Sequence, residues 1–101
     1  MLRLELHPEA TRELDDAATW YLTRSGVAAK GFALAVDVAI GKIRNDPDRF
    51  PRVDRRHRAC NLENYPFQII FRRNDERLFV VAVAHAKRRP GYWRSRLTGS
   101  P

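Results

Sequence analysis

The sequence predicts a single α+β domain in the order strand, helix, helix, strand, strand, strand. The first residues alternate between apolar and charged, two long segments repeat apolar residues at helical spacing, and the second half holds short apolar or alternating runs between turn residues. At 101 residues the chain is long enough for one modest core and too short for two. We therefore expect one domain over residues 1–101.

The first strand is expected at residues 2–6, where three leucines alternate with charged residues. His7-Pro8-Glu9 is typical of a helix start, because Pro fits the first helical position and Glu complements the helix dipole there. The predicted helix ends at Ser25-Gly26. Its apolar face follows helical spacing and consists of Ala10, Leu14, Ala17, Ala18, Tyr21 and Leu22.

A second helix is predicted up to Asn45-Asp46-Pro47, which is a stop signal. The two helices should form a hairpin. Residues 48–54 form an irregular connection, in which we expect Phe50 to pack at the edge of the core. The apolar face of the second helix consists of Phe32, Val36, Ala39, Ile40 and Ile43.

Three strands are predicted at residues 56–62, 67–72 and 78–85, with a hairpin turn at Asn74-Asp75-Glu76. The last strand is apolar on both faces, so it should be central in the sheet. We expect the helical hairpin to return the chain to the end of the sheet where the first strand finishes. The second strand would then run opposite to the first. The expected fold is a mostly antiparallel four-stranded sheet with the helical hairpin on one face.

The charge of the chain is concentrated in its second half. The formal net charge is +7, yet residues 1–48 carry 6 Lys and Arg against 8 Asp and Glu, whereas residues 49–101 carry 13 against 4. Sixteen of the 19 cations are Arg, which binds phosphate and carboxylate through two parallel hydrogen bonds. We interpret the second half as the part that meets an anionic partner. A basic, solvated surface without a dedicated partner is the alternative.

The residue types present favour a cytoplasmic protein without a metal or cofactor. The single cysteine, Cys60, cannot form an internal disulfide. The three histidines are far apart in sequence and have no metal-ligand spacing. The first residues show no apolar stretch long enough for a signal peptide or a membrane span, so we expect no membrane partner.

The end of the last strand is the strongest candidate site. An apolar run reaches His85 and gives way to five cations, two aromatics and a Pro-Gly break, so groups that hold a polyanion follow a rigid strand. Two structural interpretations compete with this one. His85 would end the strand by bonding backbone, and Tyr92 and Trp93 would fasten the tail onto the sheet.

Several short motifs occur in an order that points to a known family. They are Pro8-Glu9-Ala10 with Leu14, Trp20-Tyr21, Asn45-Asp46-Pro47 with Phe50-Pro51, the run from Asn64 to Phe71, and Val83-Ala84-His85 followed by the run from Arg88 to Trp93. Over roughly residues 2 to 97 the chain resembles the RelE/ParE superfamily of bacterial toxins, most closely its ParE-like, plasmid-stabilisation branch. The resemblance implies the toxin of a type II toxin–antitoxin module, which arrests growth and is neutralised when a cognate antitoxin wraps around it.

The branches of this superfamily differ in their target. The resemblance implies inhibition of DNA gyrase for a ParE-like toxin and cleavage of mRNA in the ribosome for a RelE-like one. The chain contains three lysines, whereas RelE-like ribonucleases carry many. This departure favours the gyrase inhibitor, which is not an enzyme. A metal-independent endoribonuclease and an inactive toxin-fold binding module stay open.

Each interpretation assigns roles to particular residues. A ribonuclease needs an acid, a base and cations for the phosphate, which His85, Arg88 and Tyr92 would supply, with His57 or Glu63 as a second acid or base. The polar strand with Arg55, Arg56 and Arg58 would receive the acidic antitoxin, with Trp20 adding an apolar groove, although a solvated strand edge explains the arginines equally well. The candidate target-binding residues are Lys87, Arg88, Arg89, Tyr92, Trp93, Arg94 and Arg96.

Overall fold

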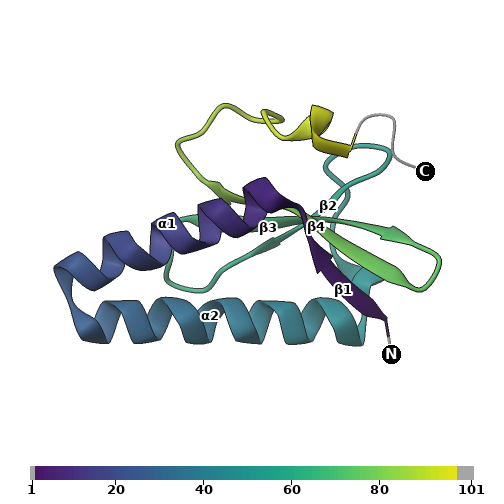
Figure 1. The fold of residues 1–101 in the computed structure, drawn as a ribbon. Coiled ribbons are helices and arrows are strands. Elements are labelled where there is room, and N and C mark those ends of the chain that lie inside the picture. Colours follow the sequence, from purple (N-terminus) through teal and green to yellow (C-terminus); the bar gives the residue numbers. More distant parts are fainter. Residues whose placement is uncertain (1, 98–101) are drawn as a thin grey trace.

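The computed structural model describes residues 2–97 and contains two helices and a four-stranded sheet in the predicted order (Figure 1). Every strand begins and ends within two residues of its predicted bounds. The elements are β1 (Arg3–Leu6), α1 (Pro8–Arg24), α2 (Gly26–Asn45), β2 (Arg58–Asn61), β3 (Phe67–Asn74) and β4 (Arg77–His85), with short 3-10 turns η1 (Pro47–Arg49) and η2 (Arg94–Leu97).

The helices begin and end at the predicted signals. His7 caps α1, since the amide of Glu9 donates to His7 Nδ1 at 3.0 Å, and Pro8 occupies the first helical position. Ser25 serves both helices: its amide donates to the Tyr21 carbonyl at the end of α1, and its hydroxyl accepts from the amide of Ala28 in the first turn of α2. The two helices therefore form the expected hairpin.

The sheet has the order β1-β4-β3-β2, with β4 between two neighbours as its apolar sequence predicted. The pairs β2–β3 and β3–β4 are antiparallel, and β1 pairs with β4 in parallel. The parallel register ends at Leu6 opposite Val80. Residues 81–85 therefore extend beyond β1 and have no strand partner on that side.

The expected direction of the second strand is wrong. Because β4 is parallel to β1 and two antiparallel pairings separate it from β2, β2 runs in the same direction as β1. The reason is where α2 ends: an Arg44 Nη atom donates to the Leu2 carbonyl at 3.1 Å, so the helix finishes beside the start of β1 and not beside its end. Figure 1 shows the chain leaving α2 close to the N-terminus.

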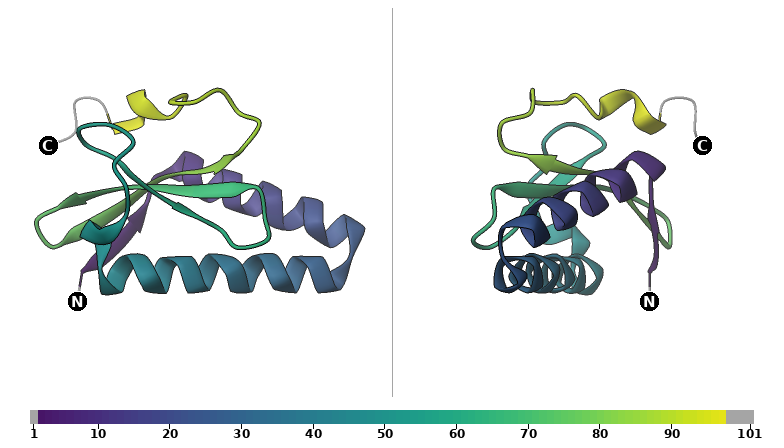
Figure 2. Two further views of the ribbon diagram at one scale, coloured as in Figure 1. Left: turned by 180° about the vertical axis from the view of Figure 1, so that it is seen from behind. Right: turned by 60° about the vertical axis from the view of Figure 1, so that its left-hand side comes forward.

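The two faces of the sheet are covered by different parts of the chain. Both helices pack on one face, where Phe32 and Ile43 from α2 contact the buried Ile69, Phe71 and Leu78 of the sheet. Phe50 packs at the edge of this core as predicted, with its ring 5.9 Å from that of Phe71. The C-terminal tail, residues 86–97, lies over the opposite face (Figure 2).

Candidate functional site

The C-terminal tail is anchored to the sheet by Trp93. The side chain of Trp93 is 4% exposed and packs on the second face of the sheet with Ile70 and Val81. Its ring also lies 4.6 Å from the ring of His57, which is itself buried. The geometry therefore supports the structural role of Trp93, in which its ring fastens the tail onto the sheet, because a buried ring has little surface left for a target.

Asp54 forms the first of two polar anchors of the tail. Its carboxylate accepts hydrogen bonds from the amides of Arg56 and His57, from His57 Nδ1 and, at 3.1 Å, from Arg94 Nε. Burial alone would raise the pKa of Asp54, but these hydrogen bonds hold the pKa well below its ordinary value. The pKa of His57 is lowered mainly by burial, so the imidazole is neutral at pH 7.

Glu13 on α1 forms the second anchor. Its two carboxylate oxygens accept from the Arg96 guanidinium at 2.9 Å each, and also from the Tyr92 hydroxyl and the Val83 amide. Burial would raise the pKa of Glu13, but the hydrogen bonds from Arg96, Tyr92 and Val83 together lower it. Arg96 also donates to the Val81 carbonyl at 3.0 Å. Glu13 and Arg96 therefore satisfy backbone groups of β4 that β1 is too short to reach.

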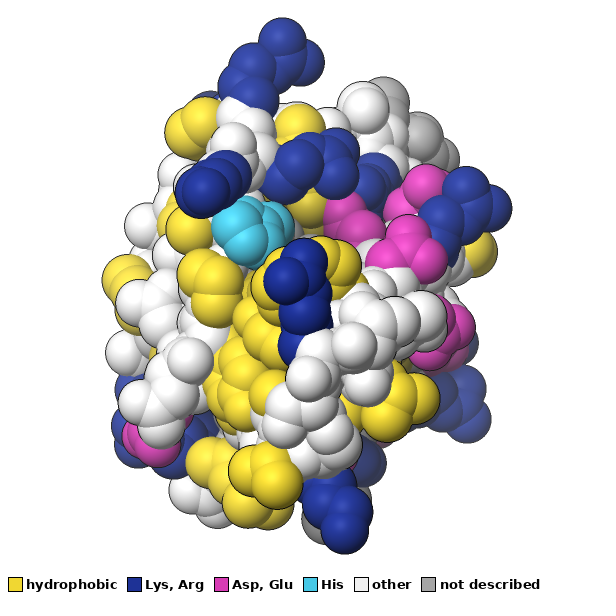
Figure 3. Space-filling view, turned by 90° about the vertical axis from the view of Figure 1, so that its left-hand side faces the viewer, with side chains coloured by type: hydrophobic (Ala, Val, Ile, Leu, Met, Phe, Trp, Pro, Cys, Tyr) yellow, Lys and Arg dark blue, Asp and Glu magenta, His cyan; other side chains and the backbone are white. Residues whose placement is uncertain are grey.

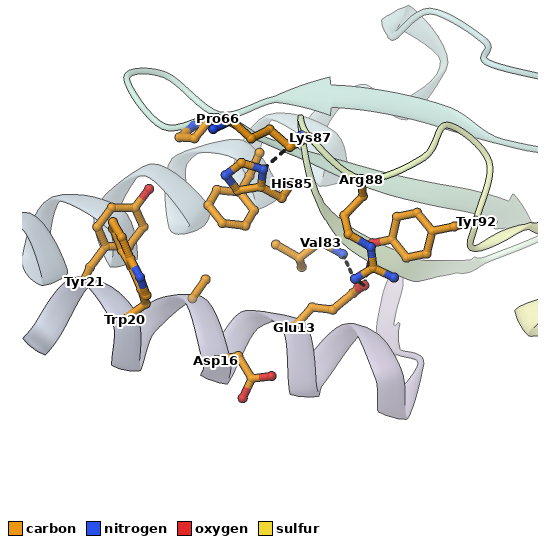
Figure 4. A pocket seen from close by; sticks show the side chains of 12 residues that line it. Glu13, Asp16, Trp20, Tyr21, Pro66, Val83, His85, Lys87, Arg88 and Tyr92 are labelled. Atoms are coloured by element: carbon orange, nitrogen blue, oxygen red, sulfur yellow. Dashed lines mark hydrogen bonds and ion pairs between the residues drawn. The ribbon is translucent and has the colours of Figure 1, made fainter.

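A groove of about 460 Å³ lies between α1 and the end of β4 (Figure 4). Its apolar wall includes Trp20, Tyr21 and Phe67, and its other end is formed by Glu13 and Arg88. Figure 3 shows this end of the molecule: apolar side chains form a band across it, Lys and Arg side chains gather above the band, and acidic side chains lie to one side. The groove joins an apolar surface to a cationic rim.

His85 lies in this groove at the point where β4 ends. The amide of Lys87 donates to His85 Nδ1 at 3.0 Å, and the imidazole packs edge-on against Phe67 with ring centres 4.9 Å apart. His85 therefore forms the hydrogen bond to backbone that its structural interpretation predicts. Because Nδ1 accepts a hydrogen bond, the ring proton of neutral His85 is on Nε2.

Tyr92 closes the groove opposite the apolar wall. Its hydroxyl donates to Glu13, and burial, reinforced by that carboxylate, raises the pKa of Tyr92 to about 12. The guanidinium of Arg88 lies 3.9 Å above the tyrosine ring. His85, Arg88 and Tyr92, predicted as a catalytic set, therefore do meet in one groove, but the tyrosine hydroxyl is already committed to a carboxylate.

The candidate target-binding residues fall into two groups. Arg96 has a side chain only 13% exposed and Arg94 is bonded to Asp54, so with Tyr92 and Trp93 they fasten the tail. The cations that the described part of the tail presents to solvent without a strong internal bond are Lys87, Arg88 and Arg89, of which Arg88 lies 4.0 Å from Glu13.

The expected antitoxin-binding residues do not form one surface. Trp20 is 53% exposed and lies in the groove beside α1. Arg55, Arg56 and Arg58 line a separate hollow near the β3–β4 turn, and of the three only Arg58 belongs to a strand. The predicted strand over residues 56–62 begins only at Arg58, so Arg56 lies with Arg55 in the preceding loop.

Neither of the two residues expected as a second acid or base for a ribonuclease lines the groove. His57 is buried beneath Trp93 on the other side of the sheet, and Glu63 is exposed and pairs with Lys42 at 3.5 Å. Among residues 2–97, no three His, Cys, Asp or Glu side chains are placed to bind a metal ion. The helices described here are too short or too polar to cross a membrane.

Sequence reasoning missed the two carboxylates that position the tail, Glu13 and Asp54. A signal for Glu13 was available, because it lies three residues after Ala10 and four before Ala17 and so shares their buried helical face. An acidic residue on an apolar face requires a buried partner. Nothing in the local sequence distinguishes Asp54 from a surface residue.

Comparison with known proteins agrees with this architecture. The model of the family described as ParE toxin of type II toxin-antitoxin system, parDE matches residues 4–90. A solved structure described as the chromosomal ParDE TA system from P. aeruginosa superposes with a TM-score of 0.72 at 18% sequence identity, covering 86% of this chain and 98% of that chain. At that identity the likeness shows a shared fold. No curated protein sequence matches the chain.

Proposed function

The chain belongs to the ParE toxin family of type II toxin–antitoxin systems, and we propose that it arrests bacterial growth by inhibiting DNA gyrase. The observation that carries this proposal is the family match over residues 4–90, which includes most of the groove and the cations at the end of β4. On this proposal Lys87, Arg88 and Arg89 contact the target, held in place by the anchored tail.

The chemistry of the groove supports binding more than catalysis. An acid–base ribonuclease needs groups that exchange protons near neutral pH. The Tyr92 hydroxyl donates to Glu13 and its pKa is raised to about 12, and His85 Nδ1 is occupied by the Lys87 amide. One nitrogen of His85 is then the single proton-exchanging atom that this trio offers to a substrate.

A ribosome-dependent mRNA endoribonuclease is the second candidate. It is favoured by the meeting of His85, Arg88 and Tyr92 in one groove, where a phosphate could lie between a cation and an imidazole. A toxin fold that has lost its activity and acts only as a binding module is the third. It shares every structural feature with the first two and differs from them in having no toxicity.

We further propose that a cognate acidic antitoxin neutralises the toxin and covers the groove. Trp20 is an exposed aromatic next to Tyr21 and Phe67, so an amphipathic segment could bury its apolar face there. Acidic residues on the same segment would meet Lys87 and Arg88 on the rim. The natural location of such a pair is the cytoplasm, where the buried thiol of Cys60 stays reduced.

Two assays after induction without antitoxin distinguish the candidates. A gyrase inhibitor abolishes DNA supercoiling by purified gyrase and leaves ribosome-bound mRNA intact in primer extension. Codon-phased mRNA cuts with normal supercoiling would assign the ribonuclease instead, and normal growth with neither effect would assign the binding module. His85→Gln sharpens the result, because Gln keeps a hydrogen-bonding side chain but exchanges no protons: a gyrase inhibitor retains at least part of its toxicity, whereas a ribonuclease loses about 10²–10⁴-fold in rate.

A further inference from the structure

A second charged hollow, of about 470 Å³, lies near the β3–β4 turn, at the end of the sheet away from His85. All eight residues that line it are charged, and six of them are arginines. The arginines come from β2, β3 and the loop that precedes β2, and the two acids, Asp48 and Asp75, come from η1 and the β3–β4 turn. We call this surface the arginine basin; its arginines are Arg52, Arg55, Arg56, Arg58, Arg72 and Arg73.

Most of the positive charge in the basin is not neutralised internally. Arg73 pairs with Asp48 at 2.7 Å, and Arg58 donates to the carbonyls of Asp48 and Phe50. Within residues 2–97, no carboxylate lies within 4.0 Å of the other four guanidinium groups, those of Arg52, Arg55, Arg56 and Arg72. Asp54, the nearest acid in sequence to Arg52, Arg55 and Arg56, is occupied by His57 and Arg94. Asp75, the nearest acid to Arg72, lines the basin without forming an ion pair to any residue that the structure describes, so the six arginines outnumber the two lining acids, Asp48 and Asp75.

The basin is held in shape before any partner arrives. Asp54 accepts from the amides of Arg56 and His57 at 2.8 and 2.7 Å, which fixes the loop between them. An Arg52 Nη atom donates to the Arg55 carbonyl at 2.9 Å, so the loop is closed by a second bond. Like charges held together in this way repel one another, and an anion that enters the basin relieves the repulsion.

The lining residues select the kind of anion. Protein interfaces centre on apolar and aromatic side chains, whereas interfaces with nucleic acid are more polar and far more positive. Of the residues that the structure describes, no apolar or aromatic one lines the basin, so it suits neither the apolar face of a peptide nor the stacked bases of a single strand. Guanidinium groups match the phosphates of a duplex, which they bind through paired hydrogen bonds.

We propose that the arginine basin binds the phosphate backbone of duplex DNA, independently of base sequence. The proposal does not depend on which target the toxin inhibits, because it concerns a surface separate from the groove and the tail. It also replaces the antitoxin as the expected partner of Arg55 and Arg56. If four of the five basin arginines without a carboxylate partner each neutralise one phosphate, the logarithm of the affinity falls with the logarithm of the salt concentration with a slope of about −3.6.

Fluorescence anisotropy of a labelled 20-base-pair DNA duplex, titrated with the purified full-length protein at several salt concentrations, tests this proposal. Arg55→Gln with Arg56→Gln should weaken binding by about tenfold or more at low salt and bring the slope to about −1.8. Two controls remove the same charge elsewhere: Arg12→Gln with Lys30→Gln on the helices, and Arg88→Gln with Arg89→Gln on the tail. Each should change the affinity by less than about threefold.

The outcomes separate this surface from its alternatives. Equal losses in the basin variant and either control would overturn the proposal, since binding would then follow net charge or belong to the tail. Tighter binding to a double-stranded RNA or to a single strand of the same length would overturn the choice of duplex DNA. Poly-glutamate serves as the probe for an acidic peptide: if the basin variant loses affinity for poly-glutamate while its affinity for DNA is unchanged, the surface belongs to a protein partner and the proposal fails.

Discussion

Glu13 and Arg96, 83 residues apart in sequence, form an ion pair with two hydrogen bonds of 2.9 Å. Both side chains are largely buried, at 15% and 13% exposure. The pair connects α1 to the end of the tail. Glu13 also accepts a hydrogen bond from the Val83 amide, and Arg96 donates one to the Val81 carbonyl. The end of the tail is therefore fixed to α1 and β4, and Lys87, Arg88 and Arg89 lie in a segment that is held at both ends.

Glu13→Ala should destabilise the fold by about 2–4 kcal/mol, because it leaves a buried guanidinium without its carboxylate and the Val83 amide without an acceptor. Urea denaturation measures the change. Glu9→Ala is the matched control on the same helix, since Glu9 contributes a charge in the first turn and an exposed pair with Arg12 at 3.9 Å, and it should cost at most about 1 kcal/mol. Equal losses in the two variants would contradict a special role for the Glu13 anchor.

The two anchors predict a loss of stability in acid. In the folded protein the pKa values of Glu13 and Asp54 lie below their ordinary values of 4.5 and 3.8. As the pH falls, the unfolded chain therefore binds more protons at these two carboxylates than the folded protein does. Their contribution is complete above those ordinary values and is lost progressively below them. His57 adds to the trend from higher pH, because its pKa is lowered from 6.5 mainly by burial.

Asp54→Asn isolates one part of this effect. The variant should be less stable than the wild type at pH 7, and the difference should narrow as the pH falls below 3.8, where the wild-type carboxylate begins to lose its advantage. Denaturation curves at pH 7, 5 and 3 measure it. Asp37→Asn, at an exposed position on α2, is the control and should change the stability at pH 7 by less than about 0.5 kcal/mol. A gap for Asp54→Asn that is the same at all three pH values would refute the anchor.

The predictable parts of the fold are those set by neighbouring residues. Alternation at residues 2–6, the Pro8 helix start and the Ser25 cap all act within one or two turns of chain, and each appears where predicted. The direction of β2 was not predictable in this way. It depends on α2 ending beside Leu2, which follows from the lengths and crossing of two helices and not from any local pattern.

In the candidate site, too, the features set by neighbouring residues were predictable and those set by distant residues were not. The tail cations were evident from composition, and the groove contains His85, Arg88 and Tyr92 as expected. Which cations stay available could not be predicted, because the acids that occupy Arg94 and Arg96 lie 40 and 83 residues away. Ion pairs over such separations depend on the completed sheet and leave no periodic signal in the sequence.

Gly31 on α2 packs against Tyr65 of the aromatic core, and a side chain at this position should disturb that packing. A Cβ atom there would overlap the Tyr65 hydroxyl, which donates to the Ala28 carbonyl at 2.9 Å. Gly31→Ala should therefore cost about 1–3 kcal/mol, although alanine favours helices. Gly41→Ala, with open space around the new atom, should instead stabilise α2 by about 0.5–1 kcal/mol. In a Tyr65→Phe background the cost of Gly31→Ala should shrink, and an unchanged cost would show that the hydroxyl is not the obstacle.

Trp93→Ala should impair folding and toxicity together. The buried ring contacts His57 and Ile70, and its removal leaves a cavity that costs about 3 kcal/mol or more. Limited proteolysis should then cut within residues 86–97 well before the helices are attacked. Full toxicity with wild-type stability in urea would show that the tail is not fastened through this side chain.

Arg88→Ala combined with Arg89→Ala should abolish toxicity and leave the fold intact. Arg88 has a side chain 55% exposed, and among residues 2–97 its guanidinium forms one cation–π contact, with the Tyr92 ring, and one ion pair, with Glu13 at 4.0 Å, so losing it should cost at most about 1 kcal/mol. Growth after induction without antitoxin gives the toxicity, and urea denaturation confirms the fold. Arg12→Ala with Lys30→Ala removes two exposed charges from the helices and should remain fully toxic. Because Trp93→Ala loses both properties and the arginine pair should lose only one, the two results separate the contact surface from its support. Full toxicity of the double arginine variant would exclude the tail as the target-binding site.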